Sequence, residues 1–374
     1  MYKIAKRKNF ILSTVIIICI ILTEAFTGCG NQKTLKSKEQ EKQTTRTIVD
    51  MAGRKVTVPF QIKKVYSVSP IGTEFMYTLS PEKIAGLNNK ISEAESKYCI
   101  DSYKKLPVLS GNFGQNNKMN REEILKIKPD VILNMNTIDS SLIENSDKIQ
   151  NDMGIPVVCV TNDLDKMDKV YEFIGNLTGD TSKAKELGDY CKKTYTEITE
   201  IAKKIPEDKR VKVYYAEGEE GLQTDPKGSQ HAQLLDLIGA INVAQVPIKF
   251  GFGRSEVSME QLLKWNPETI LVCIDQGFAT SANNPYKVIM SDPNWSSLRA
   301  VKDKKVYVIP YEPFNWFDRP PSIMRILGAK WLGNLLYPDY FKYDMKAEVK
   351  EFYDKFLHIK ITDQQYEEIM ANAK

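Results

Sequence analysis

Residues 119–133 read MNREEILKIKPDVIL, and residues 257–271 read VSMEQLLKWNPETIL, 138 positions later. Six positions are identical in the two copies: Glu122 and Glu260, Leu125 and Leu263, Lys126 and Lys264, Pro129 and Pro267, Ile132 and Ile270, and Leu133 and Leu271. Each copy predicts a short helix that begins after a polar capping residue, ends before a proline and leads into an apolar strand. One such unit in each half predicts two matched lobes, and a cleft between them would be a favourable place for a ligand.

The N-terminus is expected to be a signal peptide, residues 1–28, and not part of the fold. Four basic residues between positions 3 and 8 precede an apolar run from Ile11 to Leu22, and small residues lead to Cys29. The stretch from Phe26 to Cys29 resembles the lipobox of bacterial lipoproteins, which implies a diacylglyceryl anchor on the Cys29 sulfur. An uncleaved membrane anchor is the alternative, but the run is short for a span of about 20 residues. Both interpretations place the rest of the chain outside the cytoplasm.

The composition beyond the signal peptide predicts a tethered, nearly neutral protein. Residues 30–46 are almost wholly polar, so residues 29–46 are expected to form a lipidated cysteine and a flexible tether. Most of the net charge of +4 lies in the signal peptide, and the absence of a basic tract argues against a nucleic-acid partner. Four further cysteines are scattered, and their spacing leaves open whether they form disulfides: Cys99, Cys159, Cys191 and Cys273.

The order of predicted elements favours an α/β fold. Strand and helix patterns alternate from about residue 64 to 160, including an expected strand at Ile84–Leu87, and again from about 211 to 336. This alternation is typical of parallel sheets covered by helices. Between the two regions, apolar residues from Ser182 to Lys204 follow helical spacing, interrupted only by Gly188. We therefore predict two Rossmann-like lobes with mainly parallel sheets, residues 47–180 and 206–337, joined by one long helix, residues 181–205, with a helical extension at 338–374.

Several motifs in this order resemble one family, the ABC-transporter substrate-binding proteins that capture iron–siderophores, haem and cobalamin. They are VDMAGRKVTVP at 49–59, SPIGTE at 69–74, IKPDVI at 127–132, the repeat around Glu260, and WSSLRAVKDKKVY at 295–307. The resemblance implies the class III periplasmic-binding-protein fold, whose lobes are joined by a single helix. It also implies a monomer without a cofactor that captures a metal complex and delivers it to a permease.

The resemblance assigns a partner-binding role to Glu122 and Glu260. In the cobalamin-binding member, one glutamate on each lobe docks onto arginines of the membrane permease, and these two residues match those positions. A helix dipole would also favour an acidic residue in the first turn, by about 0.3–1 kcal/mol. That effect explains each glutamate separately, but it explains less well why both copies keep it at the same position.

Loops at the strand ends are expected to line the ligand cleft. The candidate ligand-binding residues are Ser69, Pro70, Thr73, Phe113, Gln115, His231, Phe250, Phe252, Arg254, Trp316 and Arg319. Exposed amides at the start of a helix after Ser69 could meet an anion, although Ser and Thr there could simply cap the helix. Aromatic rings suit a flat ligand, and arginines suit an anionic group. Asp318 is expected to pair with Arg319, and Phe317 to lie in the core.

Among the ionisable residues, His231 is the only imidazole expected near the cleft, since His358 falls in the C-terminal extension. It is the candidate contact for an exposed metal of the cargo, with a helix cap or a polar core residue as the alternative. Catalytic motifs for a nucleophile, a nucleotide or a zinc ion are missing from the sequence, so an enzyme is poorly supported. A binder of a small oxyanion such as molybdate or tungstate, and a tethered adhesion or structural protein, stay as alternatives.

Overall fold

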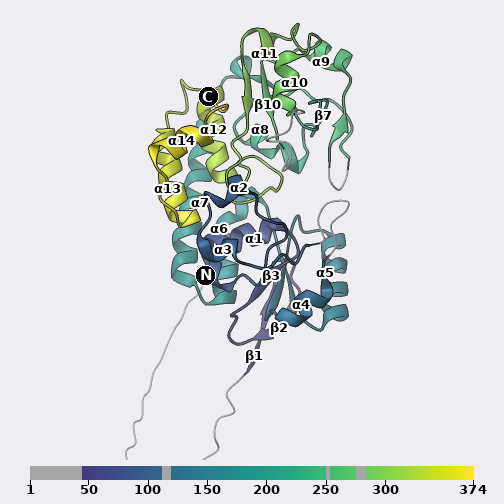
Figure 1. The fold of residues 1–374 in the computed structure, drawn as a ribbon, viewed down its shortest axis with the longest axis vertical. Helices are drawn as coiled ribbons and strands as arrows, with labels where there is room; N and C mark the ends of the chain where they lie inside the picture. The colour runs from purple at the N-terminus through teal and green to yellow at the C-terminus, as the bar shows by residue number, and fades with distance from the viewer. Residues whose placement is uncertain (1–43, 112–118, 250–252, 275–283) are drawn as a thin grey trace, which may run out of the picture. The chain divides into compact units, whose positions relative to one another are not determined.

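The computed structural model describes residues 44–111, 119–249, 253–274 and 284–374 (Figure 1). A short antiparallel hairpin, β1 (Thr45–Val49) with β2 (Lys55–Pro59), opens the fold. The Asp50 carboxylate accepts hydrogen bonds from the backbone N–H groups of Ala52 and Arg54, which closes the turn. Among the described residues, no helix has the length and apolar character needed to cross a membrane.

The first parallel sheet has the order β3 (Val65–Ser67), β4 (Val131–Met135), β5 (Val157–Val160). Every residue of its central strand is buried, as expected for a sheet covered on both faces. The helices of this half are α1 (Pro70–Leu79), α2 (Glu93–Ser96), α3 (Asp101–Lys104), α4 (Arg121–Ile127), α5 (Ser140–Met153) and α6 (Met167–Thr178). The expected strand at Ile84–Leu87 is wrong, because its two end residues make only isolated bridges.

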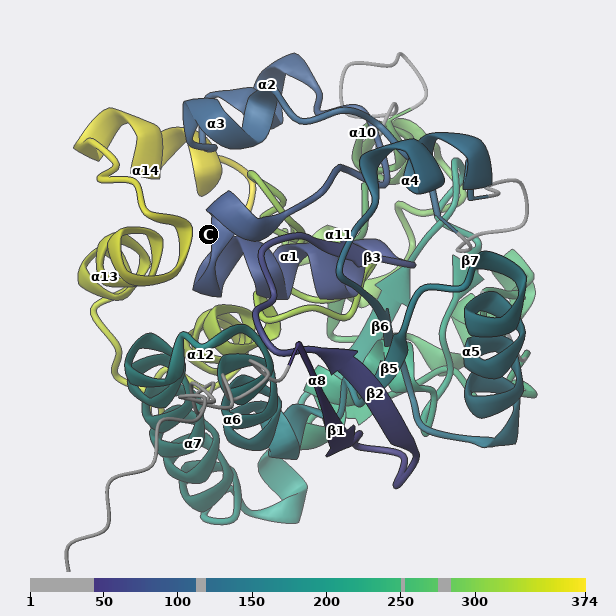
Figure 2. The same cartoon turned by 90° about the horizontal axis from the view of Figure 1, so that it is seen from below.

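One helix, α7 (Thr181–Ala202), connects the first sheet to the second along the chain, where the sequence predicts a bridging helix. It packs against α6, as Figure 2 shows from below. Gly188 does not interrupt it: a Cβ at this position would lie 3.2 Å from the Asp168 carbonyl oxygen of α6, so the glycine allows the two helices to approach closely.

The second parallel sheet has the order β11 (Val306–Val308), β10 (Thr269–Val272), β6 (Lys212–Ala216), β8 (Ile241–Asn242). The same half of the chain contains a small antiparallel pair of strands, β7 (Gln223–Thr224) and β9 (Ser255–Glu256). The helices of this half are α8 (Gln233–Leu237), α9 (Met259–Trp265), α10 (Pro285–Ser291), α11 (Arg299–Lys302) and α12 (Arg325–Leu336). The α/β class with two parallel sheets is therefore confirmed.

The C-terminal segment contains α13 (Met345–Leu357) and α14 (Asp363–Ile369), and it packs onto both halves of the fold. Tyr77 on α1 donates a hydrogen bond to the Leu357 carbonyl oxygen at 3.0 Å. The end of the chain is also held: the backbone N–H of Val308, in the outer strand β11, donates to the Asn372 carbonyl oxygen at 2.7 Å. The indole of Trp331 on α12 donates to the Ala373 carbonyl oxygen at 2.9 Å.

The sequence repeat is also a structural repeat. Helices α4 and α9 both contain seven residues, and each begins with a side-chain cap, from Asn120 and from Ser258. Each ends in a residue with left-handed backbone, Lys128 at φ 53° and Asn266 at φ 43°, followed by a buried proline. Each then leads into a buried strand that lies inside its sheet, β4 or β10. The two copies therefore present equivalent positions to solvent.

Candidate functional site

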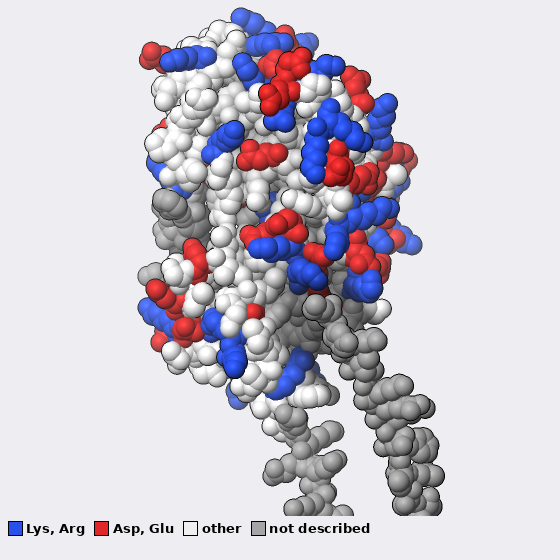
Figure 3. Space-filling model, turned by 180° about the vertical axis from the view of Figure 1, so that it is seen from behind, with Lys and Arg blue, Asp and Glu red and all other residues white. Residues whose placement is uncertain are grey.

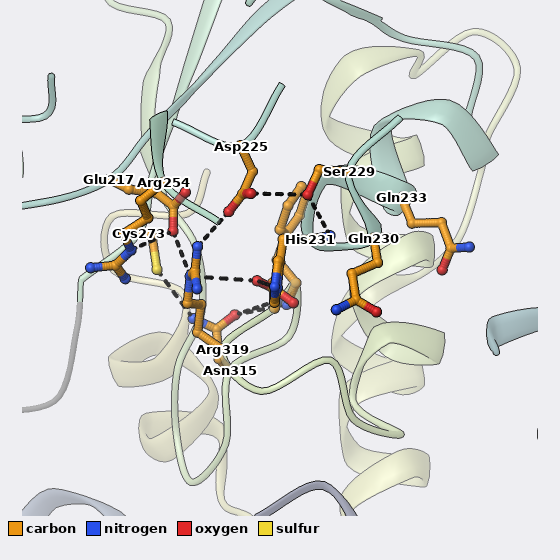
Figure 4. A network of polar contacts seen from close by, with 12 residues as sticks. Glu217, Asp225, Ser229, Gln230, His231, Gln233, Arg254, Cys273, Asn315 and Arg319 are labelled. Atoms are coloured by element: carbon orange, nitrogen blue, oxygen red, sulfur yellow. Dashed lines mark hydrogen bonds and ion pairs between the residues drawn. The ribbon is translucent and has the colours of Figure 1, made fainter. Parts of the chain in front are cut away.

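Six ionisable side chains meet in the second half of the chain, beyond the carboxyl end of β6 (Figure 4). Three are acidic and three are basic: Glu217, Asp225 and Asp318, with His231, Arg254 and Arg319. They come from the residue after β6, the segment after β7, the turn before α8, the segment before β9, and the loop between β11 and α12. The three basic residues are among the ligand-binding residues predicted from the sequence, whereas Glu217 and Asp225 are not.

Glu217 lies at the centre of this network. Its side chain is completely buried, and its Oε1 accepts hydrogen bonds from Arg319 Nε at 2.7 Å and from Arg254 Nε at 3.1 Å. Its second oxygen, Oε2, is buried and has no hydrogen-bond partner among the residues that the structure describes. Burial raises the pKa of Glu217 to about 7, although the charge of Arg319 opposes this shift.

Arg319 also contacts the other two acids. Its Nη2 pairs closely with the Asp225 carboxylate, and its Nε lies 3.6 Å from Asp318 Oδ2. Burial alone would lower the pKa of Arg319, but Glu217 and Asp318 outweigh it and raise the pKa above its ordinary value. Asp225 additionally accepts a hydrogen bond from the Ser229 hydroxyl at 2.9 Å. The predicted Asp318–Arg319 ion pair is thus one of several contacts in a larger network.

His231 is oriented by Asp318. Its Nδ1 lies 2.7 Å from Asp318 Oδ2, and its Nε2 is buried without a hydrogen-bond partner in the described part of the chain. Burial lowers the pKa of His231, but the charge and hydrogen bond of Asp318 reverse the shift and raise the pKa above its ordinary value. A carboxylate that accepts from one ring nitrogen fixes the ring and presents the other nitrogen as a ligand atom.

One group of potential metal ligands occurs among the described residues: Asp225, His231 and Asp318, with ligand atoms within 4.8 Å of one another. The Arg319 guanidinium, however, already contacts both carboxylates. It supplies the positive charge that a resident divalent ion would bring. We therefore regard the group as part of a ligand site that contains its own cations, rather than as a structural metal centre.

Local backbone geometry places both arginines. Arg254 and Arg319 have left-handed backbone, at φ 57° and φ 62°, a conformation that is uncommon outside glycine and often occurs at functional sites. Glycine is required at position 253, beside Arg254, because the backbone there passes close to the Asp225 carboxylate. A Cβ at Gly253 would lie 2.2 Å from Asp225 Oδ1. In the loop before α12, the Asn315 side chain accepts from the backbone N–H groups of Phe317 and Asp318 at 2.8 and 3.1 Å.

Trp316 is placed in the core, which argues against the ligand contact that the sequence suggests. Its side chain is 0% exposed and its ring lies 6.4 Å from that of Tyr353 on α13. The C-terminal extension covers this position, and a covering from a distant segment cannot be seen in the local sequence. Phe317 is buried, as expected for a core residue.

In the first half, the hydroxyls after β3 bond within the protein. Ser69 precedes α1 without capping it, and its Oγ donates to the Met135 carbonyl oxygen at 3.3 Å. Thr73 donates to Asn88 Oδ1 at 2.6 Å, and both Ser69 and Thr73 are buried. Pro70 is the first residue of α1 and is half-buried. Internal bonds occupy these hydroxyls, so contact with an anion would require them to exchange partners.

The loops after β4 and β5 reach the segment that carries His231. Thr137 donates to Gln230 Oε1 at 2.6 Å, which links a loop of the first sheet to the residue before His231. Arg325 of α12, only 2% exposed, donates to the Asn162 carbonyl oxygen at 2.5 Å and to Gln233 Oε1 at 3.1 Å. Burial lowers the pKa of Arg325 to about 10. The carboxyl ends of the first sheet's strands thus lie beside the network of the second.

The remaining site predictions fall into two groups. Phe113, Gln115, Phe250 and Phe252 lie outside the described residues, as does Cys29. Glu122 on α4 and Glu260 on α9 are exposed, and neither side chain has a hydrogen-bond or ion-pair partner in the described part of the chain. The four described cysteines form no disulfide with one another: Cys99, Cys159, Cys191 and Cys273.

Comparison with known proteins identifies the family. The sequence profile of the periplasmic binding proteins matches residues 73–313. The chain belongs to this family. A solved solute-binding protein of an ABC transporter from Sulfurospirillum deleyianum is 32% identical to this periplasmic binding protein, with a TM-score of 0.79, over 87% of this chain and 99% of that one.

Three curated relatives are more distant in sequence but span nearly the same length. The molybdate-binding protein MolA of Haemophilus influenzae is 26% identical over 92% of this chain and 96% of its own. YvrC of Bacillus subtilis, named as an uncharacterized ABC transporter substrate-binding lipoprotein, is 28% identical over 90% of this chain and 99% of its own. The iron-uptake system-binding protein of Bacillus subtilis is 24% identical over 84% of this chain and 96% of its own.

These matches confirm the resemblance read from the sequence motifs and the class III fold. The chain is a substrate-binding protein of an ABC transporter, and such a protein binds a small ligand outside the cytoplasm and works with a permease. Its relatives are transport proteins rather than enzymes.

Proposed function

We propose that this periplasmic binding protein captures a metal complex, such as a ferric siderophore, cobalamin or haem, and delivers it to an ABC permease. The observation that carries the proposal is the orientation of His231, whose Nδ1 is held by Asp318 while Nε2 has no hydrogen-bond partner within residues 44–111, 119–249, 253–274 and 284–374. An imidazole nitrogen presented in this way suits a metal with an open coordination position. The iron-uptake relative supports the same class of cargo.

The charge balance of the network also supports a metal complex over a free oxyanion. Arg254 and Arg319 both contact Glu217, and Arg319 contacts Asp225 as well. Binding a small doubly charged anion at these arginines would require it to compete with buried carboxylates at short range. A larger complex could instead contact the site at several points and contribute its metal to His231.

A small oxyanion such as molybdate or tungstate is the second candidate cargo. Two observations favour it: the molybdate-binding relative matches over nearly the whole chain, and two guanidiniums lie side by side on one carboxylate oxygen. The thermal unfolding temperature, measured with ferric siderophores, cobalamin, haem, molybdate and tungstate, separates the candidates, because only a bound ligand raises it. Stabilisation by the oxyanions alone would reject the metal-complex proposal.

The His231→Ala variant is expected to weaken binding of the metal complex, and Asp318→Asn should weaken it by about 10–100-fold, because the ring loses the partner that orients it. Affinity is measured by titration of tryptophan fluorescence on folded variants. His358→Gln, at the other histidine of the chain, serves as the control, since His358 Nε2 bonds the Tyr77 carbonyl oxygen away from this network. Unchanged affinity in His231→Ala would remove the histidine from the binding site.

We propose that Cys29 carries the lipid anchor and residues 30–44 the tether, so that a monomer of two lobes works at the membrane surface. The predicted bound at residue 46 was wrong, because Thr45 and Arg46 belong to strand β1. The lipobox-like stretch before Cys29 supports this, as does the name of the YvrC relative. Cys29→Ser is expected to release the protein from the membrane fraction, which immunoblotting of fractionated cells measures. A variant that stays in that fraction would contradict the anchor.

A further inference from the structure

The bond between Glu217 and the two arginines occupies groups that a ligand would use. Arg254 and Arg319 both donate to Glu217 Oε1, from 3.1 and 2.7 Å. Two guanidiniums converging on one oxygen form the arrangement with which proteins bind carboxylate, phosphate and other anionic groups. In this structure the anionic group is supplied by the protein itself.

The position of Glu217 is costly for a charged carboxylate. The side chain is 0% exposed, and no described residue supplies a hydrogen-bond partner to its buried Oε2. A buried oxygen of a charged group loses its hydration without replacement, which favours the protonated form once the arginines turn elsewhere. Burial already raises the pKa of Glu217 to about 7 while both arginines are in contact with it.

The groups around Glu217 act in opposite directions. Arg319, from the loop before α12, and Arg254, from the segment before β9, lower its pKa, whereas Asp225, from the segment after β7, raises it. Tyr214 and Tyr215 of its own strand β6 stay neutral, because burial raises the pKa of both. Once the two guanidiniums leave Glu217, its burial and the charge of Asp225 still raise its pKa, so both favour uptake of a proton.

One side of the Glu217–Arg254 ion pair faces a cavity. A cavity of about 420 Å³ lies beside Glu217 and Arg254, and three more glutamates line it: Glu219, Glu220 and Glu256. Its acidic lining disfavours entry of an anion by that route but allows water to exchange protons with the buried carboxylate.

We propose that Glu217 is an internal counter-ion that an anionic group of the cargo displaces: the two arginines turn to the cargo, and Glu217 takes up one proton from solvent. The cargo class is a complex that carries a carboxylate, catecholate, phosphate or oxyanion group. This inference rests on the proposed function, since it needs a cargo at this site. Binding of such a cargo is then coupled to pH.

The direction of the coupling follows from the protonation states. Well below pH 7, Glu217 is protonated before binding, so no proton is taken up and affinity does not depend on this residue. Above pH 7 it must take up a proton on binding, so the affinity falls by up to about tenfold per pH unit. Glu217→Gln keeps the shape without the charge, so it should bind anionic cargo roughly tenfold more tightly at pH 8 and show a flatter pH profile.

The test uses isothermal titration calorimetry of the full chain with three probes: the anionic ferric–citrate complex, molybdate and neutral cyanocobalamin. At pH 8, two buffers with different ionisation enthalpies reveal the number of protons exchanged. For each anionic probe that binds, we expect close to one proton taken up in the wild type and fewer in Glu217→Gln, and no uptake that depends on Glu217 with neutral cyanocobalamin. Any uptake by His231 would be present in both proteins, and Glu220→Gln, at an exposed glutamate of the same cavity, should behave as the wild type.

The possible outcomes separate this inference from the proposed function. If the wild type binds an anionic probe without proton uptake, or if Glu217→Gln keeps the same uptake and pH profile, the counter-ion role is rejected while the binding function stands. If the wild type binds none of the probes and none of the ligands of the thermal panel, the proposed function is rejected and this inference fails with it.

Discussion

A protein carrying both Glu122→Arg and Glu260→Arg should bind its cargo with unchanged affinity and lose uptake by more than about tenfold, because like charges forced together across an interface cost several kcal/mol. The two glutamates are exposed at equivalent positions of α4 and α9. Uptake of labelled cargo by cells and ligand titration of the purified protein measure the two properties separately.

The control must carry the same change of charge on other exposed positions. Glu93→Arg with Glu351→Arg meets this condition, since both residues are exposed and lie on α2 and α13. We expect this pair of changes to leave uptake close to the wild-type rate. Normal uptake by the Glu122 and Glu260 double variant would show that these glutamates do not dock the permease.

The structure adds a reason to treat the two helices as one type of contact surface. Leu125 and Leu263, three residues after each glutamate, are 43% and 42% exposed. Each helix thus offers a carboxylate and an apolar side chain on adjacent turns, since positions three apart are neighbours on a helix. Single charge reversals should consequently weaken uptake less than the double variant, because one of two equivalent contacts remains.

Replacement of Gly328 by alanine should lower the free energy of unfolding by about 3 kcal/mol or more, a large effect for one methyl group. The added Cβ would lie 1.7 Å from the Trp316 carbonyl oxygen and 2.7 Å from its carbonyl carbon. That backbone cannot move aside easily, because Trp316 is itself buried against the C-terminal extension. Urea unfolding followed by circular dichroism measures the loss.

Gly188→Ala is the matched control, because Gly188 is also a helical glycine packed against the backbone of another segment, here helix α6. Its nearest neighbour would be the Asp168 carbonyl oxygen at 3.2 Å, a contact that a small shift relieves, and alanine favours a helix over glycine by about 1 kcal/mol. We expect a change within about 1 kcal/mol there. Since the Trp316 loop also carries Asp318 and Arg319, Gly328→Ala should weaken ligand binding as well; equal urea midpoints for the two variants would contradict this packing.

The elements that local sequence predicts well are those with a regular apolar pattern. Helix α7 matches the expected bridging segment because its buried face repeats every turn over 22 residues, and α13 follows an equally clear pattern. The expected strand at Ile84–Leu87 was wrong because four apolar residues suit a buried extended segment whether or not it pairs as a strand. A regular apolar pattern indicates which residues are buried more directly than it indicates which segments pair as strands.

The candidate site could be predicted only in part. Arginines and a histidine in loops at the strand ends identified Arg254, Arg319 and His231, but not their partners. Arg319 lies 102 residues from Glu217 and 94 from Asp225, so no local pattern connects them. One signal was available: Glu217 directly follows a buried strand, a position from which an acidic side chain needs a compensating charge. The burial of Trp316 had no such signal.

The bond from Val308 to Asn372 has a consequence for the behaviour of the protein at high concentration. The outermost strand of a parallel sheet offers unsatisfied amide groups to any neighbouring chain and so promotes aggregation. Here the last residues of the sequence occupy that edge of β11. If a protease removes a few C-terminal residues, this edge of β11 should become exposed and promote self-association. The six ionisable side chains around Glu217 would keep their contacts.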